Sequence, residues 1–204
     1  MRYTGPKARL CRREGINLFG SPKYQKLLQR NPNIPGMHGG ARVGKLTEYA
    51  RQLREKQKAK RAFGISEQQF RNYFSRASRS KGITGDILLQ LLERRLDNVI
   101  FRAGFALTRA QGRQFASHGL FLVNGRRIDV PSYEVRLGDI IEVRDSQKNS
   151  VVFQKNLEEL STYEAPSWLS VDRKKKSLEI KDFPVQSHYE QFITPQLIVE
   201  FYSR

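Results

Sequence analysis

The residues of this sequence best suited to bind an anion are two arginines in the stretch TRAQGR (108–113). Arg109 and Arg113 are four residues apart, so they share one face of the helix that we predict over 108–119, with Thr108 as its N-cap. Arg109 lies in the first turn, where the helix dipole disfavours a cation by about 0.3–1 kcal/mol, and no acid is near it in the sequence to compensate. Two cations beside the N–H groups of a helix N-terminus can hold phosphate groups. The alternative is that both side chains lie across neighbouring apolar residues.

A tight turn follows this helix in the stretch LFLVNGRRIDV (120–130). Asn124 and Gly125 predict a two-residue type I′ hairpin, because both central residues of that turn need a positive φ. The turn puts Arg126 at the tip of the core face and Arg127 on the opposite face. The core face itself is expected to carry four apolar residues, Phe121, Val123, Ile128 and Val130. Taken alone, the pattern also fits a surface hairpin with two solvated arginines.

Enzymatic sites find little support. His38, His118 and His188 are widely separated, and none has a partner at the spacing of a metal site or a catalytic triad. Cys11 is the only cysteine, so the chain can form neither an internal disulfide nor a Cys-rich zinc site. Neither a Walker A loop nor a GxGxxG motif is present. The lack of disulfides and of a signal peptide indicates the cytosol or an equivalent reducing compartment.

The net charge of +17 is confined to the first half of the chain. Residues 1–61 hold 16 Lys and Arg against 3 Asp and Glu, whereas residues 111–147 hold 5 of each. Solubility alone would not segregate charge in this way, so a polyanion bound along one surface is indicated. No apolar run approaches the roughly 20 residues of a membrane span. Nucleic acid is therefore the expected partner, ahead of an anionic membrane or a small-molecule substrate.

Helices dominate the elements that must position these residues. We predict an extended basic arm over 1–20, a loop over 31–44, and helices over 21–30, 46–64, 66–78, 84–104, 108–119 and 148–160. Strand spacing occurs at 120–130, at 132–144, and in the late segments WLSVD, SLEIK and QLIVEF. The fold class is α+β, with a basic arm and a helical half followed by an α/β half.

The helix over 46–64 carries most of the remaining cations. We expect Leu46, Tyr49, Ala50 and Leu53 to be its buried stripe, which would turn the run LREKQKAKR outward. Contact with phosphates is favoured over a solvated face because this run continues the basic arm. The expected contacts in this half of the chain are Arg12, Arg13, Arg51, Arg54, Lys56, Lys58 and Arg71.

Residues 94–143, RRLDNVIFRAGFALTRAQGRQFASHGLFLVNGRRIDVPSYEVRLGDIIEV, closely resemble the S-four RNA-binding module. The segments PGMHG (35–39), FGISEQQFRNYF (63–74) and LLERRLDNV (91–99) resemble the bacterial family of fourth small-subunit ribosomal proteins, as does the ending LIVEFYSR (197–204). The resemblance implies a basic arm over 1–42, a helical domain over 43–91 on which the tail 190–204 packs, and an RNA-binding α/β domain over 92–189.

The resemblance also implies a function. A member of this family binds the 5′ region of small-subunit ribosomal RNA at a multi-helix junction, early in assembly. It lies beside the entrance of the mRNA channel, next to the fifth small-subunit protein, and influences decoding accuracy. The RNA contacts of the module carry over to Arg109, Arg113, His118, Asn124 and Arg126, with Arg127 as the weaker claim. Basic residues near the mRNA carry over to Arg42 and Lys45.

Two departures from the family pattern bear on these expectations. Many relatives hold zinc in the arm with a Cys-x-x-Cys that would fall on positions 8 and 11, but Ala8 replaces the first cysteine here. We therefore expect no zinc, and an arm ordered by RNA. Gly112 stands where relatives more often have Ala, which should weaken the short helix in isolation by roughly 0.5–1 kcal/mol. Two interpretations of this glycine stay open: it lets RNA backbone approach closely, or it has no particular role.

Two other functions remain open at the level of sequence. One is a free RNA-binding protein, either a translational repressor or a stress protein. The other is an enzyme of the pseudouridine synthase or tyrosine-specific tRNA synthetase type, in which the same module is an appendage. An enzyme of that type needs a catalytic domain, and the residues outside 92–145 offer no nucleotide loop and no catalytic Asp environment. No enzymatic activity is expected.

Overall fold

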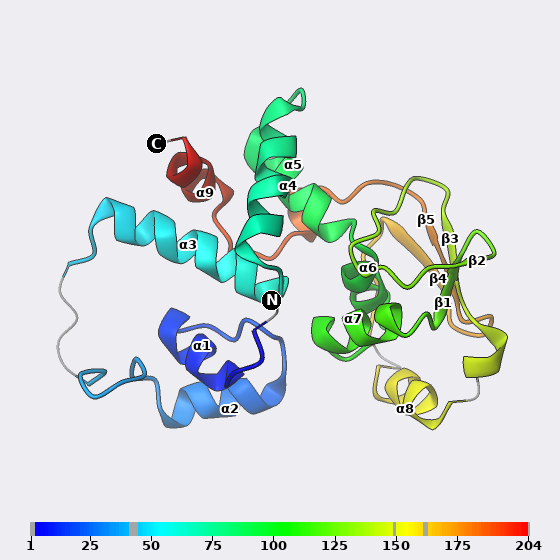
Figure 1. The fold of residues 1–204 in the computed structure, drawn as a ribbon. Helices are drawn as coiled ribbons and strands as arrows, with labels where there is room; N and C mark the ends of the chain where they lie inside the picture. The colour runs from blue at the N-terminus through cyan, green and yellow to red at the C-terminus, as the bar shows by residue number, and fades with distance from the viewer. Residues whose placement is uncertain (1–2, 41–44, 149, 161–162, 204) are drawn as a thin grey trace. The chain divides into compact units, whose positions relative to one another are not determined.

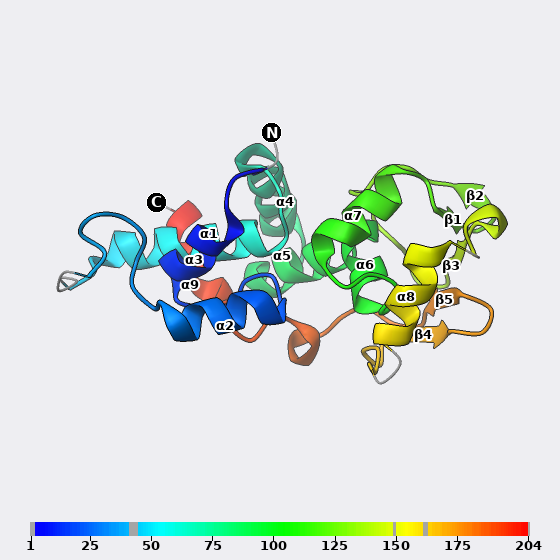
Figure 2. The ribbon, with the colours of Figure 1, turned by 90° about the horizontal axis from the view of Figure 1, so that it is seen from below.

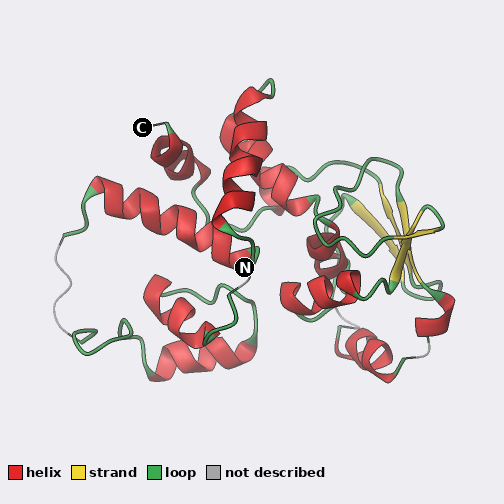
Figure 3. Ribbon diagram, in the orientation of Figure 1, coloured by secondary structure: helices red, strands yellow, loops and turns green. Residues whose placement is uncertain are grey.

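The computed structural model describes residues 3–40, 45–148, 150–160 and 163–203 and divides the chain into two compact units. Unit 1 comprises Met1–Leu88 and Glu190–Arg204, and unit 2 comprises Leu89–Tyr189. Figures 1 and 3 show that the strands belong to unit 2 and that the described part of unit 1 is helical. None of the helices in the described ranges is both long and apolar enough to cross a bilayer.

Unit 1 contains the helices α1 (Lys7–Glu14), α2 (Pro22–Arg30), α3 (Glu48–Ala62), α4 (Glu67–Arg79) and α9 (Pro195–Tyr202), and α5 (Thr84–Glu93) leads from it into unit 2. The chain end returns to α3, where Gln52 donates a 2.9 Å hydrogen bond to Glu200. Stacking of Phe74 on Tyr202, with ring centroids 4.5 Å apart, also packs α9 against α4. Residues 190–204 are therefore integrated into the helical unit.

Unit 2 is a five-stranded antiparallel sheet with helices on one face (Figure 2). Its strands are β1 (Phe121–Val123), β2 (Arg126–Arg127), β3 (Ile140–Val143), β4 (Leu169–Asp172) and β5 (Ser177–Ile180), in the spatial order β2-β1-β3-β5-β4. In β3, Ile141 and Val143 are buried while Ile140 and Glu142 are exposed, so one face of the sheet meets the core. The core also takes residues from α6 (Leu96–Arg102), α7 (Arg109–Ser117) and α8 (Val151–Glu159). Short 3₁₀ turns cover Asp145–Gln147 and Gln186–His188.

The first helix corrects the expected extended arm. Residues 7–14 form α1, in which Cys11 is fully buried, and Gly15 ends the helix with a φ of 68°. Glu14 lies on the same helix, and its carboxylate accepts from Arg54 and Arg61 of α3. A Gly- and Arg-rich segment without an apolar period is thus helical, with its thiol buried and its one carboxylate bonded to α3.

The buried face of α3 also differs from the prediction. Leu46 and Tyr49 are about half exposed, whereas the buried residues of the helix are Gln52, Glu55, Lys56, Ala59 and Ala62. Distant partners make this burial possible, because buried polar groups are tolerated when they are hydrogen-bonded. Glu55, for example, accepts a 2.7 Å hydrogen bond from the backbone N–H of Thr194.

The predicted helix over 84–104 is interrupted at Arg95, which has an extended backbone with ψ of 139°. Its side chain is only 1% exposed and donates two hydrogen bonds, of 3.0 and 2.7 Å, to the carboxylate of Asp97. Residues two apart on a continuous helix do not face each other. The break between α5 and α6 is what allows this buried pair to form.

Two strand predictions and one core prediction were wrong. QLIVEF belongs to α9, which begins at Pro195, a residue favoured at the first position of a helix. A short apolar run does not distinguish a buried strand from a buried helix. The segment SYEVR (132–136) forms no strand, and its backbone makes only an isolated β-bridge, between Glu134 and Arg95. Val130 is 51% exposed because β2 ends at Arg127, before that residue can join the core.

Candidate nucleic-acid interface

The turn between β1 and β2 has the predicted geometry. Asn124 and Gly125 have φ of 50° and 77°, and the register pairs Val123 with Arg126. The side chain of Asn124 fastens the turn to the neighbouring strand, because its amide group donates to Asp139 and its carbonyl oxygen accepts from the N–H of Ile140, both at 2.9 Å. Asn124 therefore has a structural role in addition to the predicted RNA contact.

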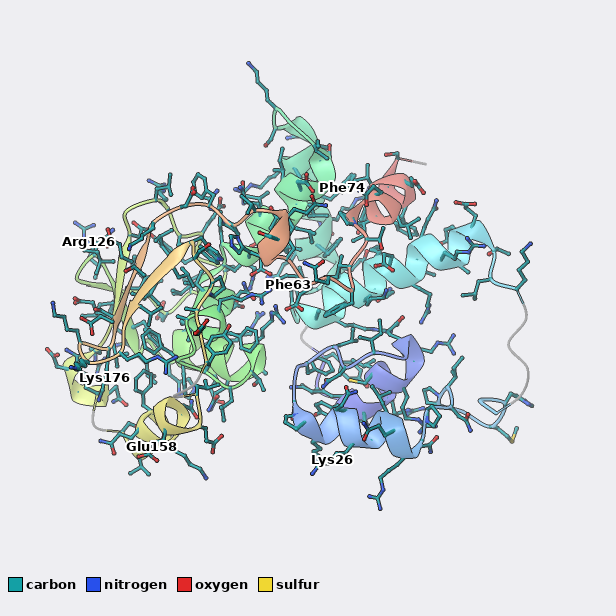
Figure 4. The ribbon with its side chains drawn as sticks, turned by 180° about the vertical axis from the view of Figure 1, so that it is seen from behind. Lys26, Phe63, Phe74, Arg126, Glu158 and Lys176 are labelled. Carbon is teal, nitrogen blue, oxygen red and sulfur yellow. The ribbon has the colours of Figure 1, made fainter. Side chains whose placement is uncertain are left out.

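The two arginines after the turn have different surroundings. Arg126 is exposed, and among the described residues its side chain has no hydrogen-bond or ion-pair partner; Figure 4 shows it on the outer side of the hairpin. The guanidinium of Arg127 lies over the end of α7, since a β-carbon at position 119 would be 2.2 Å from its Nε atom. Gly119 thus leaves space for Arg127, which links the hairpin to α7.

The helix α7 begins as predicted, but its arginines do have acids nearby. The hydroxyl of Thr108 caps the helix by accepting from the N–H of Gln111 at 3.2 Å. Arg109 donates a 2.7 Å hydrogen bond from Nε to Asn98 and lies 3.9 Å from Glu93. The premise that Arg109 lacks a compensating acid was wrong, because the acid comes from the end of α5.

We call this group of side chains the α6–α7 charge cluster. It comprises Glu93, Arg95, Asp97, Asn98, Arg102, Arg109 and Arg113. Glu93, which is 1% exposed, accepts from Arg102 at 2.9 and 2.8 Å, and Asp97 lies 3.7 Å from Arg113. Four arginines against two acids leave a charge of +2. Glu93 and Asp97 therefore anchor the arginines without cancelling their charge, which suits a surface that meets an anion.

Gly112 lies on the side of α7 that faces α6. A β-carbon there would be 2.6 Å from the backbone oxygen of Asp97, and the residue is buried. Of the two interpretations left open for this glycine, close approach of RNA backbone is excluded on this side, because α6 occupies the space. The glycine instead allows two helices to pack closely, which holds Arg113 beside Asp97.

The expected contacts on α3 are largely occupied by internal partners. Lys56 is 6% exposed; it bonds to Glu67 at 2.6 Å and lies 4.6 Å from the ring centroid of Phe201. Lys58 donates to Glu55 at 2.7 Å and to the backbone oxygen of Phe192, which precedes α9. Arg54 pairs with Glu14. Of the predicted α3 cations, Arg51 alone is both exposed and without a side-chain partner in the described ranges.

The electrostatics of Glu67 show how strongly these internal pairs hold. Partial burial acts to raise the pKa of Glu67, but hydrogen bonds from Lys56, Lys60 and Tyr202 outweigh it and lower the pKa from 4.5 to about 2. Burial and the Glu67 charge in turn raise the pKa of Tyr202. These contacts fasten α3 to α4 and α9, so Lys56 serves the fold of unit 1.

The remaining predicted residues are accessible. Arg13, Lys45, Arg71 and His118 are exposed, and Arg12 is half-buried with its Nε donating to the backbone oxygen of Asn33 at 2.9 Å. Arg42 lies outside the described residues. Binding of RNA by any of these residues stays a prediction.

Apart from Arg12, the sequence reasoning missed a second group of cations on α1 and α2. Arg9, Arg12, Lys23, Lys26 and Arg30 line one groove between these helices. The spacing of Lys23, Lys26 and Arg30 puts them on one face of α2, and this period was visible in the sequence.

Comparisons with known proteins decide the family. The model of the ribosomal protein S4/S9 N-terminal domain matches residues 2–93, and the model of the S4 domain matches residues 94–141. The chain is 47% identical to small ribosomal subunit protein uS4 of Borrelia hermsii, over 97% of this chain and 96% of the relative. It is 47% and 49% identical to the uS4 proteins of Dictyoglomus turgidum and Syntrophomonas wolfei, over 100% of this chain and 99% of each relative.

The chain belongs to the uS4 family of ribosomal proteins. The resemblance seen in the sequence is thereby confirmed, as are the α+β fold class and the RNA-binding S4 domain at the hairpin and α7. A uS4 protein is a structural ribosomal protein and not an enzyme, which removes the synthase and synthetase alternatives.

The described residues contain no group of three or more His, Cys, Asp or Glu side chains arranged to hold a metal ion. Cys11, the position that matches the zinc motif of some uS4 relatives, is packed in α1 with no exposed surface. Burial raises the pKa of its thiol, which opposes the thiolate form that zinc requires.

Proposed function

We propose that this chain is a structural constituent of the small ribosomal subunit and a primary ribosomal RNA-binding protein. The observation that carries the proposal is the similarity to uS4 proteins along 97–100% of the chain, in one continuous order. A module shared with unrelated proteins would match only residues 94–141. The sequence similarity therefore includes the N-terminal residues and the tail as well as the S4 domain.

The surface that would bind RNA in unit 2 has two parts. The α6–α7 charge cluster supplies a fixed cationic base with a charge of +2, and the hairpin supplies Arg126 and Arg127. Arg127 joins the two parts over Gly119. Structured RNA is recognised largely through its shape and phosphates, and pre-positioned guanidinium groups meet phosphates without much loss of side-chain entropy.

Three finer roles extend the proposal. The protein nucleates subunit assembly at a multi-helix junction of the ribosomal RNA. It lies near the entrance of the mRNA channel with the fifth small-subunit protein as its neighbour, and it influences translational accuracy. The exposed side chain of Lys45 supports a place near mRNA.

We also propose that the protein holds no zinc. The support is that a buried Cys11 and the buried Glu14 already fasten α1 within unit 1. Elemental analysis of the purified protein should find zinc far below one equivalent. Stoichiometric zinc that survives dialysis against a chelator would contradict this.

The alternative is a free RNA-binding protein that represses a message or acts in stress. Co-sedimentation with small subunits in rising salt separates the two. A resident of the subunit, held by many contacts, should stay with the particle at high salt. A binder that rests on Z phosphate contacts loses affinity with a log–log slope of about −0.7Z to −0.9Z, and its early release would contradict the proposal.

A further inference from the structure

Asn124 is the one asparagine of the chain that a glycine follows. An asparagine in this setting readily loses its side-chain amide, because the glycine has no β-carbon to shield the backbone nitrogen that attacks the amide. Asn124 and Gly125 are both exposed at the tip of the β1–β2 hairpin, so water reaches them. The residue types and their exposure therefore indicate a site of covalent modification.

The modification is deamidation, which needs no enzyme and no co-reactant other than water. The backbone nitrogen of Gly125 attacks the side-chain carbon Cγ of Asn124, and a new N–C bond closes a succinimide ring. The Cγ–Nδ2 bond breaks, and the amide group leaves as ammonia with the proton of the attacking nitrogen. Water then opens the ring. Cleavage of the new N–C bond gives aspartate, whereas cleavage at the backbone carbonyl gives isoaspartate, whose main chain runs through the side chain and is one carbon longer.

Bonds within the folded hairpin oppose the first step. Ring closure requires the side chain of Asn124 to lie over the nitrogen of Gly125. In the structure its amide group instead donates to Asp139 and its oxygen accepts from the N–H of Ile140, both at 2.9 Å. The backbone of Asn124 is tied to the same strand, since its N–H donates to the oxygen of Ile140 at 2.8 Å. These bonds have to break before the ring closes, so the reaction requires the hairpin to open.

Neither product fits the turn that the asparagine makes. In aspartate an oxygen replaces the amide that bonds to Asp139, so two carboxylates face each other, and like charges this close repel. Asp139 is held in place, because it is 7% exposed and its other oxygen accepts from the N–H of Arg136 at 2.7 Å. Isoaspartate lengthens a two-residue turn whose length fixes the register that pairs Val123 with Arg126. Either product therefore displaces Arg126.

We propose that Asn124 is a deamidation site that the folded hairpin protects, and that its conversion to aspartate or isoaspartate disables the hairpin as an RNA-binding surface. The loss of ammonia is irreversible, so the product accumulates on chains whose hairpin opens often and remains scarce on chains whose hairpin stays closed. The loss of RNA binding rests on the proposed ribosomal function, whereas the reaction and its suppression by the fold do not.

The first test compares the rate of conversion in the folded full-length protein with the rate in the same protein unfolded in guanidinium chloride, at one mildly alkaline pH. Mass spectrometry of the peptide that contains residue 124 measures both rates, and an isoaspartate-specific methyltransferase labels the isoaspartate. We expect the folded protein to react at least about tenfold more slowly, which corresponds to a hairpin-opening cost of at least about 1.4 kcal/mol. Equal rates would overturn the protection, and no conversion in the unfolded protein would overturn the site.

The second test asks whether facing carboxylates damage the turn. Asn124→Asp reproduces the aspartate product and should lower the unfolding midpoint temperature, followed by the fluorescence of the buried Trp168, by roughly 4–8 °C. The matched variant Asn124→Asp/Asp139→Asn again pairs one amide with one carboxylate, in exchanged positions, and should recover most of that loss. An Asn124→Asp protein as stable as the unaltered one, or an equal loss in both variants, would overturn this part of the proposal.

The third test measures RNA binding by full-length protein that was deamidated while unfolded, separated from the unreacted chain by its extra negative charge, and refolded. We expect the deamidated chain to bind small-subunit RNA about tenfold more weakly than unreacted chain taken through the same steps, the effect of losing one charge-assisted contact. Equal affinity would overturn the functional consequence. Failure of the unreacted chain to prefer small-subunit RNA over a control RNA would instead overturn the ribosomal function, and the deamidation site would stand.

Discussion

The arginines of the S4 domain differ in exposure and in whether they have acidic partners within the protein. Arg109 and Arg113 are partly covered and have acids beside them, at 3.9 and 3.7 Å. Arg126 is exposed, and no ion pair or hydrogen bond engages its side chain within the described ranges. Removing Arg126 should therefore affect RNA without affecting the fold, whereas removing Arg109 would do both.

The substitution Arg126→Ala is expected to weaken binding to small-subunit RNA and to reduce the salt slope by about 0.7–0.9, the value for one phosphate contact. Filter binding at several salt concentrations measures this. Unfolding followed by the fluorescence of Trp168, the single and buried tryptophan, should be unchanged.

The exposed Arg136 is the matched control, because it lies in the same unit and is no predicted contact. If Arg126→Ala and Arg136→Ala bind RNA equally well, Arg126 does not contact RNA and the hairpin serves only to reverse the chain.

Glu67 predicts a pH dependence for unit 1. Its pKa is lowered from 4.5 to about 2, so its ionised form stabilises the fold fully above about pH 4.5, and this contribution is lost as the pH falls towards 2. Because Glu67 is about half exposed, Glu67→Gln should cost only about 1 kcal/mol at pH 7.

Hydrogen exchange of the amides in α3 and α4 measures this difference, which should shrink between pH 4.5 and pH 3. The exposed Glu158→Gln is expected to change stability by less than about 0.5 kcal/mol. If the difference in unfolding free energy between Glu67→Gln and the unaltered protein stays constant with pH, the lowered pKa of Glu67 is refuted.

At the scale of elements, Gly112 sets the distance between α6 and α7. The variant Gly112→Ala gains helix propensity of about 1 kcal/mol but must move the backbone at Asp97, and overpacking costs about 1–3 kcal/mol. A net loss of roughly 1 kcal/mol is expected, together with weaker RNA binding as Asp97 shifts from Arg113. Denaturation followed by Trp168 fluorescence measures the loss.

Gln114→Ala serves as control because Gln114 is exposed on the same helix. Equal or higher stability of Gly112→Ala than of the unaltered protein would show that the close packing of α6 on α7 does not require a glycine at this position.

Much of the element pattern was predictable because its causes are local. The Asn124-Gly125 turn and the helix predicted over 66–78 are both present, and the latter begins with a capping box of Ser66 and Gln69, which acts through neighbouring residues. The break at Arg95 was not predictable, because it depends on a buried pair whose geometry requires non-helical backbone.

The sequence allowed the arginines of the candidate site to be predicted, but not the side chains that hold them in place. Positions 109, 113 and 126 were identified from spacing and turn chemistry. The acids that anchor Arg109 and Arg113 come from α5 and α6, so only the tertiary fold reveals them. The same holds for Lys56, whose partners Glu67 and Phe201 are 11 and 145 positions away in the chain.

At the scale of the whole molecule, some cations pair with acids inside the protein, while others have no acid beside them. Many cations of the first half pair with internal acids, as Arg54 and Arg61 do with Glu14, whereas the groove between α1 and α2 is lined by five cations and no acid. Unit 2 has little net charge but concentrates arginines at α7 and the hairpin. The two units thus differ in how many of their cations have internal acidic partners.

Crosslinking the full-length protein to total cellular RNA, with both partners mapped, tests the central claim most directly. The predicted result is that crosslinks concentrate in the 5′ region of small-subunit ribosomal RNA and arise on the protein from α7, the hairpin and α1. Crosslinks spread over messenger or transfer RNA, or absent from small-subunit RNA, would contradict it.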